Sequence, residues 1–274
     1  MMRASIVVIG DEILGGFVRD TNSGWIAGRL HAMGVPLDRI VTVPDDCGAI
    51  DDALTGELAR PRPRVLLTSG GIGSTPDDVT VAAVAATLGL GLRVEPEIDA
   101  RITRALQWTI AQGAEITPEH ERAMRKMALV PEGARLLAST GGIAPGIVVD
   151  VERGCHHEGG VTIVILPGVP SELKRIVREG IEPALLVGHG APLHVAEARH
   201  GYPESTLSPV LDRLVAEFPD LHVGSYPDLE CVIRLKGPRD RVEQAMKLVR
   251  DFIAHLDADP SSQRLRAAWN ARWQ

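Results

Sequence analysis

A glycine-rich turn followed by two carboxylates is the part of this sequence with the clearest chemical meaning. The apolar residues 65–67 run into Thr-Ser-Gly-Gly-Ile-Gly at residues 68–73, and Ser-Thr-Pro-Asp-Asp follows at residues 74–78. A strand, a glycine turn and a helix start expose backbone N–H groups to an anion, because glycine has no Cβ to block its approach. The residues predicted to hold a phosphate in this way are Gly70, Gly71, Ile72, Gly73 and Thr75.

The two aspartates after the turn suggest a metal. We expect a helix over residues 76–88 with Thr75 as its N-cap, which places Asp77 and Asp78 in the first helical turn. Two carboxylates beside a bound phosphate can share a divalent cation with it. The alternative is structural: Thr75 and Asp78 have the spacing of a capping box, so Asp78 would only hold a backbone N–H. The turn is neither a Walker A loop nor a G-x-G-x-x-G fingerprint.

Acidic pairs also follow the first two apolar stretches of the chain. Asp11 and Glu12 come shortly after the first stretch, and Asp45 and Asp46 come shortly after the second. Parallel strands that alternate with helices bind ligands at their carboxyl ends, so we expect the three acidic pairs to meet at one edge of the sheet. This convergence favours a ligand site there over three unrelated solvated loops.

Short apolar strands alternate with helices of about 10 to 15 residues, a pattern typical of an α/β fold with a parallel sheet and helices on both faces. The expected strands of this domain are residues 4–9, 37–43, 65–68, 147–151 and 161–166. The expected helices are residues 23–33, 49–58, 76–88, 97–112, 118–127 and a last one that ends near residue 180. Asn22 or Ser23 is expected to cap the first helix, and Ser171 the last.

A change of composition near residues 188–192 divides the chain. We expect a large α/β domain over residues 1–186 and a smaller α+β domain with β-α-β-β-α order over residues 187–257. Residues 258–274 form a predicted tail helix. Its stripe of Leu265, Trp269 and Trp273 docks either on the protein's own surface or on another subunit.

Composition excludes several classes of protein. The chain has 274 residues and a net charge of -7, which argues against a dedicated nucleic-acid binder. Its first apolar stretch, residues 6–9, is too short for a signal peptide, and no apolar run reaches about 18 residues, so we expect a cytoplasmic protein without a membrane span. Its three cysteines are far apart, which disfavours structural zinc and disulfides. The cluster at residues 155–158, Cys-His-His-Glu, lies at a predicted hairpin tip, where an exposed loop is favoured over a metal site.

Several ordered motifs resemble the N-terminal region of the competence/damage-inducible protein A (CinA) family, within the MoaB/Mog molybdopterin-binding fold. The motifs are residues 10–16, Asp20-Thr21-Asn22-Ser23, residues 70–80, Ala144-Pro145-Gly146 and Leu-Pro-Gly-Val-Pro-Ser-Glu at residues 166–172. The resemblance is strong over residues 4–180 and weaker to about residue 256, where Gly201-x-x-Glu204-Ser205 is similar to the family's small second domain. We expect Ser205 to act as a helix N-cap.

The resemblance implies a three-layer α/β fold and a nucleotide-like or pterin ligand over the glycine turn. In the CinA branch the implied activity is metal-dependent hydrolysis of a pyrophosphate such as that of ADP-ribose, with FAD as the substrate of a relative. In the Mog branch it is adenylyl transfer to molybdopterin. Asp77 stands where Mog-type sequences usually carry a basic residue, which favours the CinA branch.

There are departures from the family pattern. Ser74 replaces the proline usual in the turn, and Ile143 replaces the threonine usual before Ala-Pro-Gly. Full-length CinA proteins also carry a C-terminal deamidase domain, for which this chain leaves no room, so deamidase activity is not expected.

We therefore expect a metal-dependent nucleotide pyrophosphate hydrolase that uses Mg²⁺, Mn²⁺ or Co²⁺ and forms a homo-oligomer. The alternatives are a molybdopterin- or nucleotide-binding protein without turnover, and an adenylyltransferase of molybdenum-cofactor synthesis. The catalytic candidates are Asp78, Asp45 and Glu12, and the metal-ligand candidates are Asp77, Asp78 and Asp45. The ligand-binding candidates beyond the glycine turn are Asn22, Pro145, Gly146 and Gly168, and Lys174 and Arg175 are either contacts to a second phosphate or a solvated helix face.

Overall fold

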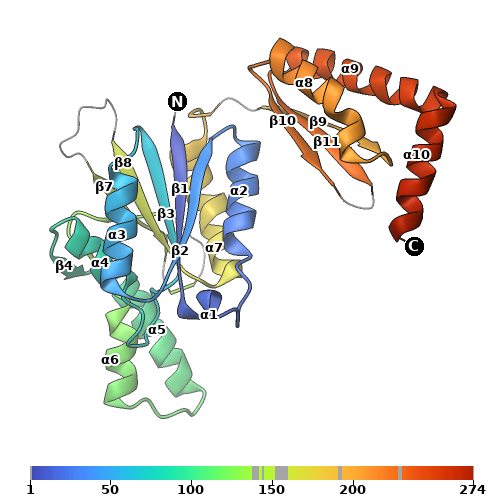
Figure 1. Cartoon of the computed structure of the whole chain (residues 1–274). Helices are drawn as coiled ribbons and strands as arrows, with labels where there is room; N and C mark the ends of the chain where they lie inside the picture. Colours follow the sequence, from blue (N-terminus) through green and yellow to red (C-terminus); the bar gives the residue numbers. More distant parts are fainter. Residues whose placement is uncertain are drawn as a thin grey trace. The chain divides into compact units, whose positions relative to one another are not determined.

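The computed structural model of the chain describes residues 2–137, 142–143, 145–151, 160–190, 193–227 and 230–273. It divides into two compact units, Met1–Ala191 and Pro192–Gln274, whose elements are labelled in Figure 1. The expected boundary after residue 186 lies inside the first unit, and the expected tail segment belongs to the second unit.

Six strands form the main sheet of the first unit. They are β1 (Arg3–Ile9), β2 (Leu37–Val43), β3 (Arg64–Ser69), β6 (Arg135–Leu136), β7 (Ile147–Val151) and β8 (Val161–Leu166). Their order is β2-β1-β3-β8-β7-β6. The first four of these neighbours are parallel, whereas β7 is antiparallel to β8 and β6 to β7. The predicted mostly parallel α/β sheet is confirmed.

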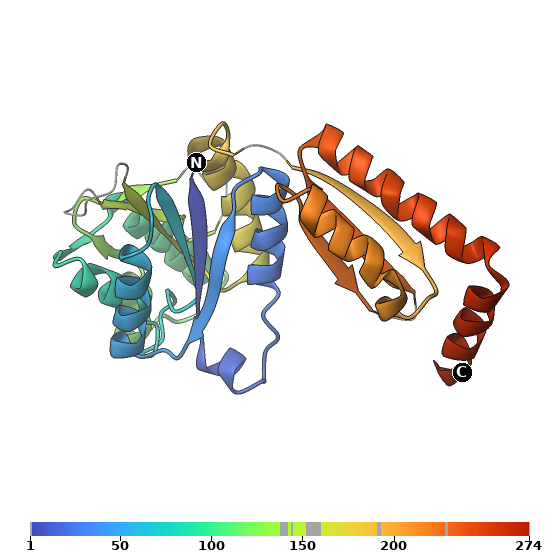
Figure 2. The same cartoon turned by 45° about the horizontal axis from the view of Figure 1, so that its top comes forward.

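Helices cover both faces of this sheet (Figures 1 and 2). The helices of this unit are α1 (Asp11–Leu14), α2 (Asn22–Ala32), α3 (Cys47–Leu58), α4 (Thr80–Thr87), α5 (Pro96–Ala111), α6 (Pro118–Lys126), α7 (Pro170–Ile176) and its π-helical continuation η1 (Val177–Leu186). One hydrophobic cluster joins α3, α4 and α5 to one face, and another joins α2, α7 and η1 to the opposite face. The unit therefore has three layers.

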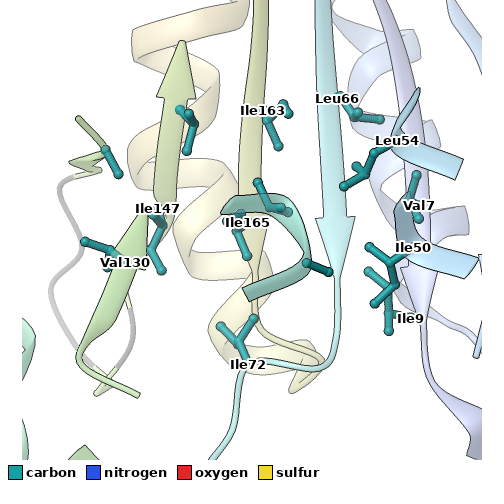
Figure 3. Packing of buried hydrophobic residues seen from close by; sticks show 14 of the residues in the cluster. Val7, Ile9, Ile50, Leu54, Leu66, Ile72, Val130, Ile147, Ile163 and Ile165 are labelled. Carbon is teal, nitrogen blue, oxygen red and sulfur yellow. The ribbon is translucent and has the colours of Figure 1, made fainter. Parts of the chain in front are cut away.

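Both core layers consist of aliphatic side chains. In Figure 3, Ile50 and Leu54 of α3 lie against Val7 of β1 and Leu66 of β3, and all four are fully buried. Each such side chain contributes about 1.5–3 kcal/mol to folding. Every residue of β3 is buried, as expected of a central strand covered on both faces.

A small two-stranded sheet, which the sequence did not predict, brackets α5 and α6. Its strands, β4 (Leu92–Val94) and β5 (Leu129–Pro131), are antiparallel. Three residues are too few for an alternating pattern to stand out from a loop. Because β4 precedes α5 and β5 follows α6, the pairing of the two strands brings the start and the end of this helical segment together.

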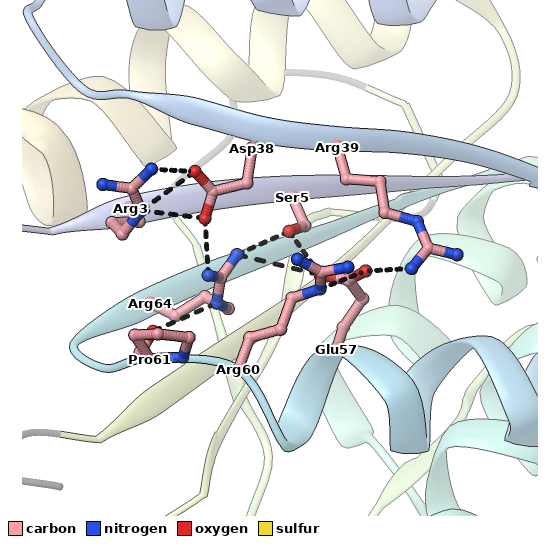
Figure 4. Close-up of polar contacts among 8 residues, drawn as sticks. All are labelled: Arg3, Ser5, Asp38, Arg39, Glu57, Arg60, Pro61 and Arg64. Carbon is pink, nitrogen blue, oxygen red and sulfur yellow. Dashed lines mark hydrogen bonds and ion pairs between the residues drawn. The ribbon is translucent and has the colours of Figure 1, made fainter.

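A buried network of charges joins the starts of β1, β2 and β3 to α3 (Figure 4). The Arg64 side chain is fully buried and lies 2.6 Å from Asp38 Oδ2, 2.6 Å from Ser5 Oγ and 3.7 Å from Glu57 Oε2. Glu57 is only 1% exposed, and it accepts a hydrogen bond of 2.5 Å from the Ser5 hydroxyl and one of 3.0 Å from Arg60 Nε. The carboxylates balance the buried guanidinium charge.

The second unit is a three-stranded antiparallel sheet with helices. Its elements are β9 (His194–His200), the 3₁₀ turn η2 (Glu204–Leu207), α8 (Ser208–Glu217), β10 (His222–Tyr226), β11 (Cys231–Gly237), α9 (Arg239–Ala258), α10 (Pro260–Asn270) and η3 (Ala271–Trp273). The strand order is β10-β11-β9, and α8 and α9 supply the buried side chains opposite the sheet. Ser205 lies inside η2 rather than at a helix N-cap, so its expected capping role is wrong.

The tail helix α10 docks on its own unit through polar groups rather than through its apolar stripe. Arg266 lies 2.6 Å from Asp257 and stacks 5.2 Å from the ring of Tyr202, whose hydroxyl donates to the same Asp257 at 2.7 Å. Leu265 remains 47% exposed. Helix α10 thus contacts its own unit, but docking through the apolar stripe is not confirmed, and a contact of the stripe with another subunit stays a prediction. No helix within the described ranges is long and apolar enough to cross a membrane.

Candidate functional site

The glycine turn lies at the carboxyl end of β3, between the ends of β1 and β8. The strand register pairs Ser69 with Val8 on one side and with Leu166 on the other. Gly70 and Gly71 have φ angles of 109° and 65°, which favour glycine. A Cβ on Gly70 would lie 2.1 Å from the Ile9 carbonyl oxygen, so the turn packs against the end of β1.

Thr80 closes the turn, and this corrects the predicted start of the helix. Its N–H donates to the Gly71 carbonyl at 3.0 Å and its hydroxyl donates to the Gly70 carbonyl at 2.9 Å. Helix α4 therefore begins at Thr80, with Val79 as its N-cap, and Thr75 lies in the preceding loop. Thr75 is wrong as the N-cap because the turn consumes the first residues that the sequence assigned to the helix.

Three successive backbone N–H groups of the turn have no acceptor among the residues that the structure describes. Those of Gly71, Ile72 and Gly73 make no hydrogen bond to any part of the chain that the structure describes, whereas Gly70 donates to the Leu166 carbonyl at 3.1 Å. Successive unpaired N–H groups in a turn are an anion-binding arrangement. Since unpaired donors are costly when they are kept from water, they indicate a ligand or solvent position over the turn.

Asp78 has the structural role predicted by the capping-box spacing of Thr75 and Asp78, since it holds a backbone N–H. Its Oδ2 accepts from the Thr75 N–H at 2.8 Å and from the Thr75 hydroxyl at 2.6 Å. It lies beside Gly73, where an added Cβ would come within 2.6 Å of the same oxygen. Asp78 therefore holds residues 73–78 in a closed loop, which positions the free N–H groups.

Lys126 is a residue of this region that sequence reasoning missed. It is the last residue of α6, and its ammonium group donates to the Thr75 carbonyl oxygen. It lines a small pocket of about 40 Å³ together with Gly73 and Asp78. The two segments are 51 residues apart in sequence, and nothing in the local pattern links them.

Asp45 stands on the opposite side of the turn. Its Oδ2 accepts the Asp11 N–H at 2.9 Å, and its Oδ1 would lie 3.2 Å from a Cβ on Gly71. Burial raises the pKa of Asp45, the Asp11 N–H opposes this, and the charges of Glu12, Asp11 and Asp77 raise the pKa further. The structure thus brings acids from the ends of β1, β2 and β3 together, as the topology predicted.

Asp46, which follows Asp45, does not belong to this group of acids, and Glu12 lies at its border. Asp46 is the N-cap of α3 and accepts the Ala49 N–H at 2.9 Å. Glu12 lies in α1, and its carboxylate folds over Gly10, where an added Cβ would come within 2.7 Å of it. Asp46 is therefore structural, whereas Glu12 borders the site.

A pocket of about 130 Å³ extends from the turn towards α2. The residues that line it include Glu12, Asp20, Asn22, Ser69, Gly70 and Gly168. Asn22 donates through Nδ2 to the Gly168 carbonyl at 2.8 Å and to Ser69 Oγ at 3.2 Å. The predicted ligand residues Asn22 and Gly168 are thus linked to each other beside the turn.

The N-cap of α2 is Thr21, and the preceding Asp20, rather than Asn22 or Ser23, accepts the first N–H groups of the helix. Its Oδ1 accepts the N–H groups of Asn22 at 2.9 Å and Ser23 at 3.0 Å. The predicted caps of this helix are wrong because the preceding carboxylate is the better acceptor, and this leaves the Asn22 amide available for the site. Ser171 is likewise not a cap, since α7 begins at Pro170 after Val169.

Pro145 and Gly146 lie at the same edge of the sheet but serve its packing. They precede β7, whose first residue pairs with Ile165 of β8. Both are buried, and a Cβ on Gly146 would lie 2.7 Å from Ile176. The adjoining residues 138–141 and 144, and the Cys-His cluster of residues 155–158, lie outside the described residues.

The contacts that the described residues give for Lys174 and Arg175 lie away from the turn. The ammonium group of Lys174 lies 5.8 Å from the centre of the Trp25 ring, and Arg178 lies 5.3 Å from the same ring. Arg175 borders Gly142, where its Nη2 would be 3.1 Å from an added Cβ. The helix-face interpretation fits Lys174 better than a phosphate contact.

The acids do not form a closed metal cage. No group of three or more His, Cys, Asp or Glu side chains that could hold a metal ion occurs among the described residues. One oxygen of Asp78 is taken by Thr75, and one of Asp45 by the Asp11 N–H. Mg²⁺ is usually held by one or two carboxylates together with substrate phosphates, so Asp45 fits a cation that arrives with its phosphate.

Comparison with known proteins places this site in a family. Residues 5–187 match the family described as "Probable molybdopterin binding domain". The chain belongs to this family. A protein of Pyrobaculum arsenaticum is 36% identical over 228 residues, which are 82% of this chain and 79% of that protein.

Two similar proteins indicate that this chain belongs to the CinA branch of the family. The CinA-like protein of Geobacter sp. (strain M21) is 35% identical over 237 residues, which are 85% of this chain but 53% of that protein. The solved structure of CinA from Thermoplasma acidophilum, described as having unknown function, is 31% identical with a TM-score of 0.52, over 66% of this chain and 96% of that one. The first unit is thus a CinA-type domain with the MoaB/Mog-like fold.

Proposed function

We propose that this protein hydrolyses a nucleotide pyrophosphate such as ADP-ribose or FAD in the presence of a divalent metal ion. The observation that carries the proposal is the set of three unpaired N–H groups on Gly71, Ile72 and Gly73, with the Asp45 carboxylate beside them. Backbone donors suit phosphate oxygens, and a carboxylate suits the cation that accompanies a pyrophosphate.

The chain's own residues supply binding and orientation. The N–H groups of the turn would hold one phosphate, and the Asp78–Thr75 loop keeps them in place. Asp45 would hold the cation, which when bound neutralises developing charge and lowers the pKa of water. Lys126 stands beside Gly73, where its positive charge favours an anion.

The reaction is a displacement at phosphorus. The oxygen of water bonds to one phosphorus of the pyrophosphate and the bond to the bridging oxygen breaks, which gives AMP and ribose 5-phosphate from ADP-ribose. Glu12 borders the pocket and is our candidate to accept the proton of the water. The second phosphate leaves with the electrons of the broken bond.

The test is product formation from ADP-ribose and FAD with Mg²⁺, Mn²⁺ or Co²⁺. We expect AMP release that needs the metal, and a loss of at least about 100-fold in Asp45→Asn, since one charge-stabilising group contributes about that much. Asp212→Asn, an exposed aspartate of the second unit, is the matched control and should match the wild type.

The alternative is binding or transfer without hydrolysis. The family description, a molybdopterin-binding domain, favours it. In that case a nucleotide raises the melting temperature but no product forms from a dinucleotide alone. Adenylyl transfer would appear only when ATP and molybdopterin are both present.

A further inference from the structure

Several contacts that hold helix α10 on its unit converge on Tyr202 and Asp257. Arg266 of α10 stacks 5.2 Å from the Tyr202 ring and lies 2.6 Å from Asp257, which also accepts the Tyr202 hydroxyl at 2.7 Å. No residue of α10 is buried, and the hydrophobic cluster of this unit contains no side chain of this helix. Elements with few buried contacts open at a lower free-energy cost than the core around them.

The backbone of residues 200–202 lies under the same helix. A Cβ on Gly201 would lie 3.3 Å from Asn270 Nδ2 and 3.4 Å from Arg266 Cδ, and both of these side chains belong to α10. The helix therefore packs directly on the Gly201 backbone. A movement of residues 200–202 would displace the surface on which Arg266 and Asn270 rest.

His200 holds this backbone from inside the unit. Its Nδ1 accepts the Tyr202 N–H at 3.3 Å, which requires that Nδ1 carries no proton. The proton of the neutral ring is then on Nε2, which is buried and has no hydrogen-bond partner among the described residues. The His200 side chain is thus neutral while α10 is docked, and its residue is only 6% exposed.

The surroundings of His200 disfavour a positive charge on its ring. Burial is the largest effect and lowers the pKa of His200, and the negative charge of Glu204 in η2 opposes this. On β11 the register partner of His200 is Cys231, a buried residue. The charges that α9 and α10 bring to this region, Asp257 and Arg266, are paired with each other.

A proton on Nδ1 would conflict with the docked arrangement. It would set two donors, Nδ1–H and the Tyr202 N–H, against each other and place a positive charge in a buried site. Movement of residues 200–202 towards solvent relieves both conflicts, but it displaces Tyr202 and with it the contacts of α10. Because burial lowers the pKa of His200 from 6.5, the docked state is fully stable above pH 6.5 and loses stability as the pH falls through the lowered pKa.

We propose that His200 makes the docking of α10 sensitive to pH, so that protonation of its imidazole in mildly acidic solution releases the helix while the rest of the second unit stays folded. The release is local because the hydrophobic cluster that covers the sheet does not include α10. It uncovers the backbone of Gly201 and the ring of Tyr202. The proposal does not depend on the proposed function of the first unit.

The test is hydrogen–deuterium exchange followed by mass spectrometry at pH 7.5 and pH 5.0, with rates corrected for the intrinsic effect of pH. In the wild type the amides of α10 should exchange at least about tenfold faster at pH 5.0, the effect of one pKa unit between the docked and released states. The amides of β11 should keep their protection. His200→Asn places an amide oxygen near the position of Nδ1 and cannot gain a proton, so its α10 should stay protected at both pH values.

The matched control is His255→Asn in α9. His255 can also gain a proton near neutral pH, but its positive charge favours the Asp259 carboxylate that caps α10, so it acts against release. This variant should therefore keep the acid-induced exchange of the wild type. Arg266→Met, which removes the contacts with Tyr202 and Asp257, should expose the α10 amides at both pH values and gives the rate of the released helix.

A second measurement does not depend on the folding of His200→Asn. Coupling between two events is reciprocal, so release of α10 by Arg266→Met should raise the midpoint at which His200 titrates in an NMR experiment. An unchanged midpoint would refute the coupling. Equal α10 protection of the wild type at both pH values, an acid-induced increase that persists in His200→Asn, or simultaneous loss of protection in β11 would each overturn the proposal.

Discussion

Removal of one charge from the buried network of charges that joins the starts of β1, β2 and β3 to α3 should destabilise the first unit strongly. The change is Glu57→Gln, which keeps the shape of the side chain. Glu57 is 1% exposed and accepts from Ser5 at 2.5 Å and from Arg60 at 3.0 Å, with Arg64 3.7 Å away. The glutamine NH₂ would face guanidinium donors or leave the Ser5 hydroxyl without its acceptor.

The expected loss of unfolding free energy depends on the ion pairs that Arg64 keeps. Breaking a buried ion pair costs about 3–5 kcal/mol because the other charge stays buried. Arg64 keeps Asp38 at 2.6 Å, so the lower end, about 3 kcal/mol, applies. For a unit of this size about 1 kcal/mol shifts the melting temperature by about 2–4 °C, so we expect a decrease of about 6–12 °C.

The assay is urea unfolding and thermal melting followed by circular dichroism. The matched control is Glu97→Gln in the same unit, which breaks an exposed pair with Arg101 and should cost about 0.3–0.5 kcal/mol. A loss below about 1 kcal/mol in Glu57→Gln, similar to that of the control, would refute the view that this carboxylate balances the buried arginine.

Three further predictions concern the turn and the network. Gly71→Ala should abolish pyrophosphate binding in calorimetry, since its φ of 65° disfavours alanine and the new Cβ would lie 2.3 Å from Thr80 Oγ1; retained binding would show that the turn tolerates the change. Lys126→Met should weaken pyrophosphate binding by about tenfold and reduce its dependence on salt, and an unchanged salt dependence in a titration series would exclude a role for the ammonium charge. Hydrogen bonding by Arg3, then by Arg64, holds the pKa of Asp38 below 3.8, so the stability it provides is present above that pH and lost as the pH falls through the lowered pKa. Urea unfolding from pH 6 to pH 2 should therefore show a smaller acid loss in Asp38→Asn than in the wild type, and parallel curves would contradict this.

The sequence predicted the fold well where periodicity was strong. Strand β2 (Leu37–Val43) has the bounds that the apolar pattern indicates, and β1, β3, β7 and β8 differ from expectation by at most one residue at each end. Aliphatic runs bounded by glycine or acidic residues leave few alternatives to a buried parallel strand. The α/β class follows from that alternation.

Helix starts and long-range contacts were harder to predict. Thr75 looks like an N-cap, but α4 begins at Thr80 because the hydrogen bonds of Thr80 to the glycine turn compete with local capping. Ser171 also looks like an N-cap, but α7 begins at Pro170, a residue that suits the first helical position. The convergence of Asp45 with the turn followed from topology, since parallel strands end at one edge. The contact of Lys126 with the turn could not be predicted, because nothing in the sequence around this helical lysine indicates which distant loop it touches.

The free N–H groups of Gly71, Ile72 and Gly73 have a consequence for how this site can change. Main-chain amides do not titrate and cannot be removed by exchanging a side chain. Their contribution to phosphate binding should therefore not change with pH, apart from the ionisation of the phosphate itself, and should persist while the surrounding side chains diverge. Changes in the pocket walls can therefore alter which ligand is bound without disturbing these N–H groups.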